Sequence, residues 1–521
     1  MAGWSLWSKD IIFLVTHDSV AGPKAWIDAY HSMHSKYTAE DLSLLSGALQ
    51  GAVCLDYPFD HRFETLHIAY DGINGQLPNL DLFNTAVSIA SGQMGIGTSI
   101  QGMHKHDDSY YQRLLTLIKG MSSQAFGHAT GPHSVFMRYH VDAITLTTIG
   151  QGWQDEMALG RTVESICRSL NNLLEHLHQS FFFYLLMQSN RFVSIGTYLP
   201  SAMAVAAGFT IMAIHLWVKS GHLEVKAEQT RVPDSRTAPD NAKDISTKKD
   251  ATVSTEKEKT EKEKPSTPDN AKDISIKKDA TIGTEEEKTE KEKPSTPPTN
   301  FPETTTTTTT TDRQLALPLT FLIAIHLLAL VPLYLFTLLS KKDIPQVLVL
   351  MSAFTLLLPI ILASALPNMP ENVYLPALAA PTASQYTITK SLSLLVLGLL
   401  LSALATLNFS LSMTLGLLAA PLAFVGRVEP KDYKAKPWLA GLEYAALAVA
   451  SPVGVVVGAA AWAFSQTGNA DAVVEAVNKA AFGWNVWSSW GVPVGIWCIW
   501  WPAWVVSAVL VASSWYATDN I

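Results

Sequence analysis

The sequence is poor in cysteine and in charge. Its 521 residues include three cysteines, and Asp, Glu, Lys and Arg together make up 16% of the chain. Cys54 and Cys167 lie far apart in the sequence and Cys498 lies in an apolar stretch, so neither a disulfide framework nor a zinc-finger spacing is indicated. The formal net charge of -8 gives no reason to expect nucleic acid as a partner.

The sequence also lacks the common signatures of a nucleophile and of a signal peptide. No Gly-x-Ser-x-Gly motif occurs, and no cysteine has both a nearby histidine and an activating context, which argues against nucleophilic catalysis by this chain. At the N-terminus, no basic segment precedes an apolar run of about 7–15 residues, which is the pattern of a signal peptide.

What the sequence does have is long apolar stretches, all of them after residue 190. A bilayer core requires roughly 20 apolar residues of helix to cross it, and seven stretches are candidates. They are residues 192–218, 315–339, 347–366, 391–407, 411–425, 439–464 and 492–515. The fourth and fifth could also be one bent helix. Because backbone polar groups in lipid must be paired within the segment, we predict an all-α polytopic membrane bundle, with a first helix at 192–218 and about six more over 315–515.

Residues 219–313 separate the first two apolar stretches and have a different composition. Residues 239–246 recur as residues 268–275, a period of 29, and a run of threonines follows from Thr304 to Thr311. A solenoid repeat would need an apolar face for stacking, which these units lack. We therefore predict a disordered, charged linker on the cytosolic side.

The short loops give the orientation. The loop over residues 426–437 carries one arginine and three lysines, and the positive-inside rule places such a loop in the cytosol. Counting back through seven spans places residues 1–190 in the lumen and the C-terminus in the cytosol. Lys341 and Lys342 would then be lumenal, which counts mildly against this scheme.

Residues 1–190 have the pattern of a water-soluble α/β domain. The predicted strands are residues 9–15, 51–56, 63–70 and 139–149. The predicted helices are residues 22–32, residues 79–89 and a long amphipathic helix that includes Val163, Cys167, Leu170, Leu174 and Leu177. This alternation predicts a mainly parallel sheet with helices on both faces, and the long helix is expected to run almost directly into the first membrane span.

Acidic residues follow two of the predicted strands. His17 and Asp18 come after the first strand and Asp56 ends the second, and functional groups gather at the carboxyl ends of such strands. These residues could share one crevice and bind zinc. The alternative, which we favour, is that they cap the loops at the strand ends.

Two further groups of histidines have weaker claims to a function. Residues 104–108 read His-Lys-His-Asp-Asp, which looks like a metal-binding group, but they lie in a polar loop. His176 and His178 flank a helix stripe, and we expect them to face solvent or the membrane surface.

Six segments resemble the anchor-attachment subunit family of GPI transamidase. They are residues 4–15, 25–31, 72–82, 174–182, 191–196 and 406–411. The resemblance implies a lumenal domain like a zinc aminopeptidase, followed by a multi-span bundle, in a complex of the endoplasmic reticulum membrane. That complex removes a C-terminal signal from a proprotein and joins the new carboxyl end to the ethanolamine of a GPI glycolipid. A different, caspase-like subunit carries the cysteine nucleophile, and this subunit recognises GPI and helps to present it without being catalytic itself.

The resemblance also shows where this chain departs from the pattern. The family has a membrane anchor and an earlier part of the lumenal domain, so we expect the α/β domain here to be N-terminally incomplete. Where the aminopeptidases have a glutamate pair, this chain has Thr16, His17 and Asp18, and no histidine follows the predicted strand that ends near Ile149 until His176. Asp56 does match an acidic ligand position. We therefore predict no competent zinc site and no cofactor, with Asp18 and Asp56 as remnants of a metal site.

For the glycolipid, the resemblance suggests Pro502 in the last span. Proline frees a backbone carbonyl and bends a helix, and a bend could open a groove for an acyl chain or a headgroup. The alternative is that Pro502 only shapes the packing. Two other functions stay open: a membrane-bound metallopeptidase or metal-assisted amide synthetase, and a transporter. The spans show few of the ionisable groups that an ion-coupled transporter needs, His215 and His326 being the clearest.

The predicted orientation can be tested by protease protection in sealed microsomes. An epitope inserted in residues 1–190 is expected to resist added protease until detergent is present, whereas one in the loop 426–437 is expected to be cleaved in intact vesicles. Immunoblotting measures both. Cleavage of the N-terminal epitope in intact vesicles would contradict the orientation.

Overall fold

The structure, a computed structural model, describes a large part of the chain. The described residues are 7–35, 37, 40–57, 62–173, 182–223, 309–310, 313–340, 343–368, 381–427, 437–468, 475, 482–484 and 486–516. The chain divides into two units, one made of Met1–Leu223 with Thr310–Ile521 and the other of Glu224–Thr309. Nearly all of the predicted linker, the basic loop after Arg427, Lys341 and Lys342, and His176 and His178 lie outside the described residues. The elements below belong to the first unit.

A mixed four-stranded sheet organises the α/β part. Its strands, in spatial order, are β1 (Gly51–Asp56), β4 (Asp142–Gln154), β2 (Phe63–Ala69) and β3 (Gly97–Ser99). The pairs β1–β4 and β2–β3 are parallel, and β2–β4 is antiparallel. The strands predicted at residues 51–56, 63–70 and 139–149 are therefore confirmed, and the sheet is parallel in two of its three pairings.

Helices cover both faces of this sheet. The helical elements of the α/β part are α1 (Ala21–Tyr30), η1 (Ile73–Gly75), α2 (Leu80–Val87), the π-helical turn η2 (Ser88–Gln93), α3 (Tyr110–Phe126), α4 (Ser134–Met137) and α5 (Glu156–Asn171). Successive residues of β4 point to opposite faces: Ile144 packs in the core shared with α2 and α5, while Ala143 packs in the core shared with α1 and α4. Side-chain caps fix the helix starts; Asn79, for example, accepts a hydrogen bond from the Asp81 amide at 2.8 Å before α2.

The prediction of a buried strand at residues 9–15 is wrong. Phe13 is 76% exposed and Val15 is 93% exposed, and no described strand pairs with this segment. Lys9 is held by hydrogen bonds to the end of α5, where its ammonium donates to the Leu170 carbonyl at 2.8 Å. An apolar run forms a buried strand only if other elements pack against it. Here most of its side chains remain exposed in the described residues.

The path from α5 to the membrane also differs from the prediction. Helix α5 ends at Asn171, and an antiparallel hairpin of β5 (Tyr184–Gln188) and β6 (Arg191–Ser194) precedes the first span. The long helix therefore does not run into the span. Leu174 and Leu177, which were expected to extend its apolar stripe, lie outside the described residues.

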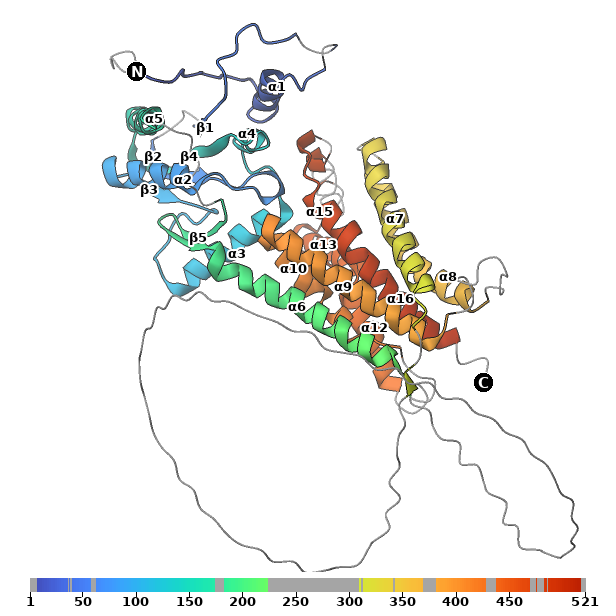
Figure 1. Cartoon of the computed structure of the whole chain (residues 1–521). Coiled ribbons are helices and arrows are strands. Elements are labelled where there is room, and N and C mark those ends of the chain that lie inside the picture. Colours follow the sequence, from blue (N-terminus) through green and yellow to red (C-terminus); the bar gives the residue numbers. More distant parts are fainter. Residues whose placement is uncertain are drawn as a thin grey trace, which may run out of the picture. The chain divides into compact units, whose positions relative to one another are not determined.

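The second half of the chain forms a helical bundle (Figure 1). Its elements are α6 (Ile195–Ser220), α7 (Ala316–Leu338), α8 (Ile344–Ala365), η3 (Leu366–Asn368), α9 (Ala383–Leu407), α10 (Phe409–Ala419), η5 (Ala420–Ala423), α12 (Pro437–Val449), α13 (Pro452–Thr467), α15 (Gly491–Val494), the π-helical turn η6 (Gly495–Trp500) and α16 (Trp501–Tyr516). A two-residue strand, β7 (His222–Leu223), follows α6.

Five of these helical segments are long and apolar enough to span a membrane. They are α6, α7, α8, α9 and the continuous segment Gly491–Ser514. The pair α12 and α13 makes a sixth if its 67° bend is counted within one span, and the shorter segment Phe409–Ala423 falls below the required length. The described residues thus give five or six spans where the sequence suggested seven, and the paired stretches around Asn408 are two helices.

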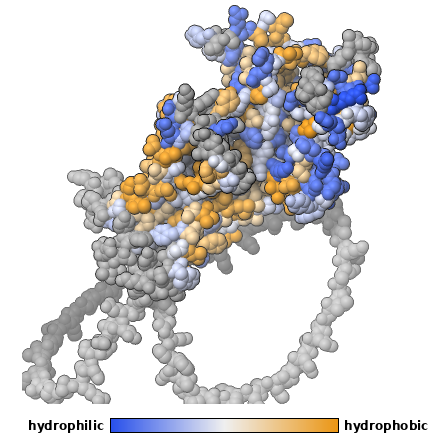
Figure 2. Space-filling view, turned by 180° about the vertical axis from the view of Figure 1, so that it is seen from behind, coloured by the Kyte–Doolittle hydropathy of each residue, from blue (hydrophilic) through white to orange (hydrophobic). Residues whose placement is uncertain are grey.

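Apolar surface surrounds the bundle. Large side chains such as Leu327, Val349 and Ile361 are more than half exposed, and Figure 2 shows hydrophobic residues covering much of this part of the molecule. Because exposed apolar area on this scale is unfavourable in water, it indicates contact with lipid. The chain is a multi-pass membrane protein.

Close packing of α6 against α9 forms the centre of the bundle. A Cβ atom at Gly398 would lie 2.8 Å from Oγ1 of Thr210 and 2.9 Å from the carbonyl oxygen of Ala206. Glycine at this point lets the two backbones approach closely, as small residues do at membrane helix contacts. The Ser391 hydroxyl adds a hydrogen bond of 2.7 Å to the Ala213 carbonyl across the same interface.

A polar junction joins the α/β part to the bundle. The Asn408 carboxamide donates to the carbonyl oxygens of Asn74 and Gln124, both at 2.9 Å, and accepts from the Leu411 amide at 2.9 Å as the N-cap of α10. Asn74 adopts the left-handed backbone conformation, with φ 58°, which asparagine tolerates better than most residues. Its side-chain oxygen accepts from the Gly491 amide at 2.9 Å, so one turn contacts two membrane segments.

Replacing Asn408 with alanine is expected to weaken this junction. The change leaves two carbonyl oxygens without their donor and removes the cap of α10, which together cost about 2–4 kcal/mol. The expected result is a lower thermal unfolding midpoint of the purified protein in detergent. Thr406→Ala is the control, because the Thr406 hydroxyl is exposed and bonds only within its own helix. Equal midpoints for the two variants would contradict the role of the junction.

Candidate functional site

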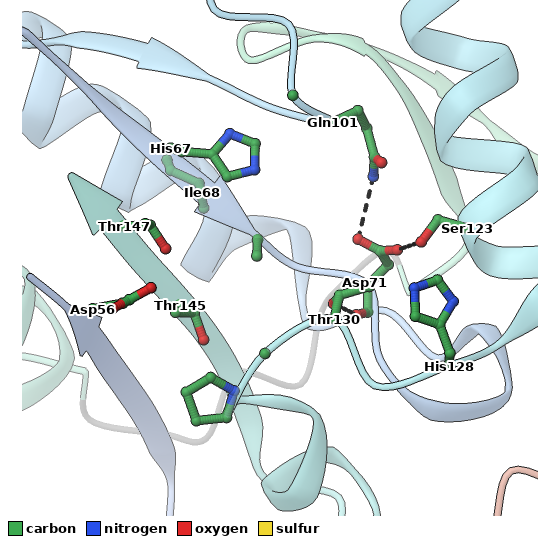
Figure 3. A pocket seen from close by; sticks show the side chains of 14 residues that line it. Asp56, His67, Ile68, Asp71, Gln101, Ser123, His128, Thr130, Thr145 and Thr147 are labelled. Atoms are coloured by element: carbon green, nitrogen blue, oxygen red, sulfur yellow. Dashed lines mark hydrogen bonds between the residues drawn. The ribbon is translucent and has the colours of Figure 1, made fainter. Parts of the chain in front are cut away.

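A polar pocket of about 330 Å³ opens at the sheet of the α/β part (Figure 3). Its lining side chains come from three neighbouring strands and from the loops that follow them. They are Asp56, His67, Ile68, Ala69, Asp71, Gln101, Gly102, Ser123, His128, Thr130, Gly131, Pro132, Thr145 and Thr147. The strand register explains the grouping, because Thr147 on β4 is paired with both Asp56 on β1 and His67 on β2. Paired residues place their side chains on one face.

Asp71 is the most enclosed acidic group of the pocket. Its side chain is 3% exposed and accepts hydrogen bonds from the Gln101 amide at 3.2 Å and from the Ser123 hydroxyl. Gln101 also donates to the Tyr70 hydroxyl at 3.2 Å, and burial raises the pKa of Tyr70. Since no lysine or arginine is among the lining residues, the two carboxyl groups make the pocket acidic and suit it to neutral or cationic groups.

His133 lies next to the pocket and contacts two of its lining residues, Thr145 and Asp71. It is fully buried, with Nδ1 2.7 Å from the Thr145 hydroxyl and Nε2 3.1 Å from the Asp71 carbonyl oxygen. Because a carbonyl oxygen can only accept, Nε2 carries the proton and Nδ1 accepts from Thr145. Burial lowers the pKa of His133 to about 4, so the imidazole is neutral at physiological pH and acts as a structural link.

The structure separates the two acidic residues that could have shared a crevice. Asp56 lines the pocket, whereas Asp18 does not. The Asp18 carboxylate instead accepts hydrogen bonds from the amides of Ala21 and, at 2.8 Å, Val20. These bonds lower the pKa of Asp18. Asp18 is therefore a loop cap at the start of α1, as the alternative interpretation had it, and the shared crevice is not formed because the preceding strand is not formed.

Residues 104–108 do not gather around a common centre. The His104 ring lies against His67, with centroids 5.8 Å apart, while Nδ1 of His106 accepts from the Asp108 amide. Asp107 accepts from the Ser109 amide, and Asp108 pairs with Arg191 at 3.0 Å. The carboxyl and imidazole groups thus stabilise the turn that leads into α3.

The donor arrangement does not fit the zinc centre of an aminopeptidase. Within the described residues, no three His, Cys, Asp or Glu side chains are close enough to hold a metal ion. Asp71 in the pocket and His133 behind it are occupied by hydrogen bonds to Ser123 and Thr145. Burial also raises the pKa of the nearby Cys54 thiol to about 12, which keeps it protonated and makes it a poor ligand or nucleophile.

Pro502 lies in the interior of the bundle. It is buried near the start of α16 and directly follows the π-helical turn η6. Proline has no amide hydrogen, so the Cys498 carbonyl loses its usual partner at the end of the π-helical turn. The segment Gly491–Ser514 stays one continuous span. Pro502 is buried in this structure, and the groove that the sequence suggested there stays a prediction.

Unpaired polar atoms lie close to Pro502 in the sequence and elsewhere in the bundle. The Trp500 indole nitrogen is buried without a hydrogen-bond partner, whereas the indoles of Trp501 and Trp504 donate to Thr355 at 3.0 Å and to the Leu447 carbonyl at 2.9 Å. An apolar crevice lies four to eight residues beyond Pro502 along the helix, between α7, α9 and α16, and is lined there by Val506, Val509 and Leu510.

Lys390, which no sequence pattern singled out, is the most deeply buried lysine or arginine among the described residues of the bundle. Lys390 is 2% exposed and its ammonium has no hydrogen-bond partner. The carboxyl group of Glu443 in α12 interacts with it electrostatically. The span expected at residues 391–407 began one residue too late to include it. A lysine preceding an apolar stretch was the available signal.

The two histidines noted in the predicted spans do not line a path through the bundle. His215 lies on the outer surface of α6, and Nδ1 of His326 bonds within its own helix at 2.9 Å.

The neutral state of His133 predicts a pH dependence of stability. Between pH 6.5 and about 4 the unfolded state binds a proton that the folded state excludes, so the free energy of unfolding falls as the pH falls, by up to about 1.4 kcal/mol per pH unit. In His133→Gln this loss is expected to be smaller. Thermal unfolding in detergent over that pH range measures it, with the exposed His128→Gln as the control. Parallel curves for parent and His133→Gln would contradict the assignment.

Comparison with known proteins places this architecture in a family. A profile described as Gaa1-like, GPI transamidase component, matches residues 1–508. Over 223 residues the chain is 40% identical to the "GPI transamidase component gaa1" of Schizosaccharomyces pombe, covering 42% of this chain and 38% of that protein. Over 228 residues it is 36% identical to the "GPI transamidase component GAA1" of Saccharomyces cerevisiae, covering 43% of this chain and 36% of that protein. The matched region thus spans less than half the length of these curated relatives. The chain belongs to the Gaa1-like, GPI transamidase component family.

Proposed function

We propose that this chain is a non-catalytic subunit of the GPI transamidase complex in the endoplasmic reticulum membrane. It recognises the GPI glycolipid and helps to present it to a caspase-like catalytic subunit, which attaches it to the new C-terminus of a proprotein. The observation that carries the proposal is the family match over residues 1–508, supported by two relatives that are each named as a component of the transamidase.

The chemistry of the pocket supports a role in holding rather than in catalysis. The Ser123 hydroxyl and the Gln101 amide both donate to Asp71, so this carboxyl group is held in one position by two donors. His133 is buried and committed to Thr145. The pocket therefore offers hydrogen-bond acceptors and negative charge in fixed positions, which suits the binding of hydroxyl or ammonium groups.

The layout of the bundle supports a lumenal α/β domain and a cytosolic C-terminus. Asn408, at the end of α9, contacts the α/β part, whereas Tyr386, in the first turn of α9, lies 5.3 Å from the Arg427 guanidinium. Arg427 opens the basic loop that the positive-inside rule assigns to the cytosol. Tyr386 also contacts Ser513 near the end of α16, so Arg427 and the end of α16 lie at the end of α9 that is remote from the α/β part.

A glycolipid requires an apolar region for its chains and polar groups for its headgroup, and the bundle contains both. Pro502 marks the helix where we place GPI, because the buried indole N–H of Trp500 is an unused donor only two residues away. An unsatisfied donor of this kind is costly in a membrane interior, and a phosphate or hydroxyl oxygen of a ligand would satisfy it.

The other two functions receive less support. A metallopeptidase or metal-assisted amide synthetase would need a donor set that the pocket residues do not form. A transporter would need ionisable groups along a path through the bundle. Lys390 and Glu443 are such groups, but both lie toward one end, near Tyr386 and Gly426.

The subunit assignment is tested by removing the protein from cells. Proproteins that retain their C-terminal GPI signal are expected to accumulate, and surface levels of anchored proteins are expected to fall, as measured by immunoblotting and flow cytometry. Re-expression of the parent gene should restore both. Normal anchoring in cells without the protein would overturn the proposal.

The role of Pro502 is tested by substitution. Pro502→Ala restores the missing amide and is expected to reduce the amount of GPI that co-purifies with the complex severalfold, as quantified by mass spectrometry. Pro359→Ala, a buried proline inside α8, is the matched control and should leave GPI unchanged. Equal GPI content in the two variants would mean that Pro502 only shapes packing.

A further inference from the structure

Helix α3 carries large apolar side chains on its outer face, which is unusual for a helix at a water-exposed surface. Tyr110, Tyr111, Leu114 and Ile118 are 76%, 71%, 40% and 50% exposed, and the polar Lys119 and Ser122 are exposed beside them. The side turned inward carries Thr116, Gly120 and Gln124, which are buried. A helix that covers a core from the solvent side has its apolar stripe inside, so the outer face of α3 requires an apolar environment.

The position of α3 relative to the first membrane span indicates what that environment is. Leu117 and Met121 pack with side chains from the beginning of α6, namely Tyr198, Leu199 and Met203. These follow the start of α6 at Ile195 by three to eight residues, or roughly 5–12 Å along the helix axis. Since α6 has 26 residues, about 39 Å of helix for a bilayer core of about 30 Å, its first turns lie at the headgroup level.

The hairpin next to α3 and the two residues that precede it are also rich in exposed aromatic side chains. Phe182, Phe183 and Phe192 are 41%, 46% and 42% exposed, and an ion pair of 3.0 Å between Arg191 and Asp108 ties the hairpin to the turn before α3. Figure 1 shows α3 and β5 beside the first turns of α6. Aromatic side chains gather in this way at membrane interfaces, where one end is apolar and the other is hydrated.

We propose that α3 lies in the interface of the leaflet on the α/β side of the membrane, with Tyr111, Leu114 and Ile118 in contact with phospholipid. Helices of this kind insert about 5–10 Å below the headgroups, which matches the depth given by the contacts with α6. Lys119 is exposed at the edge of the apolar face, where an ammonium group meets lipid phosphates. Continuity with the lipid-facing surface of α6 favours lipid over a protein partner.

This placement goes beyond GPI recognition, because it concerns bulk phospholipid and requires no other subunit. It also has a consequence for the pocket. The inner face of α3 forms part of the pocket wall, since Ser123 donates to Asp71 and Gly120 faces the Tyr70 hydroxyl, which a Cβ would approach to 3.4 Å. The pocket is thus held one helix diameter from the membrane surface.

Site-specific photo-crosslinking in the full chain, expressed in native membranes, tests the proposal. A diazirine amino acid replaces Ile118, Leu327 on the lipid-facing side of α7, or Arg161 on the exposed side of α5. After irradiation, mass spectrometry identifies the adducts. Ile118 is expected to give phospholipid adducts in a yield close to that of Leu327, and Arg161 is expected to give a much lower yield.

Two results would overturn the proposal. A crosslink from Ile118 to another polypeptide would show that a protein covers this face, and a lipid yield no higher than that of Arg161 would show that water does. Because Ile118 is half exposed, its replacement leaves the core unchanged, and normal GPI anchoring in cells that carry the variant confirms that the protein is folded. A failure here is therefore distinct from a failure of the proposed function.

Discussion

The carboxamide of Asn408 is the group on which the arrangement of this molecule depends. It ends α9, starts α10 and donates to two backbone carbonyls of the α/β part. Ser410 adds a bond of 3.1 Å to the Gln124 side chain, and the Ser489 hydroxyl donates to the Gly127 carbonyl at 2.6 Å. A buried polar group is costly when it loses its partner, so these hydrogen bonds stabilise one relative position of the two parts. A ligand held by the helices would meet the pocket in a defined geometry.

The polar groups in and beside the pocket are held in place by internal hydrogen bonds. Those of Asp71 come from an amide and a hydroxyl, and burial keeps His133 neutral. A group with both ring nitrogens committed cannot shuttle a proton without losing a structural bond. The hydrogen bonds thus give this part of the α/β domain a fixed shape.

Local sequence signals predicted much of the fold. Asn79 before an apolar run marked the start of α2, and the β-branched and apolar runs marked β1, β2 and β4, because caps and alternation are local properties. The run at residues 9–15 failed because its burial depends on a neighbouring layer that the run itself cannot specify. The span predicted at residues 411–425 corresponds to α10 and the turn η5, which together are shorter than the helices that meet the length of a span.

The candidate site was only partly predictable. Asp56 could be found because it ends a strand, but Asp71, Gln101 and Ser123 come together from a loop, a turn and a helix that are 22 to 52 residues apart. Only the tertiary fold brings them together. The apolar outer face of α3 was readable in principle, but a stripe of this kind normally indicates a core contact, and the location of the membrane was needed to interpret it.

The glycine contact between α6 and α9 has a consequence for the order of assembly. About 160 residues separate the end of α6 from the start of α9, which corresponds to roughly 10–30 s of synthesis at common translation rates. During that interval α6 is in the bilayer without its main partner. Its contact face, formed by Ala206, Phe209 and Ala213, is small and apolar enough to remain in lipid at little cost. Helix α6 can therefore remain in the bilayer until α9 has been synthesised and packs against it.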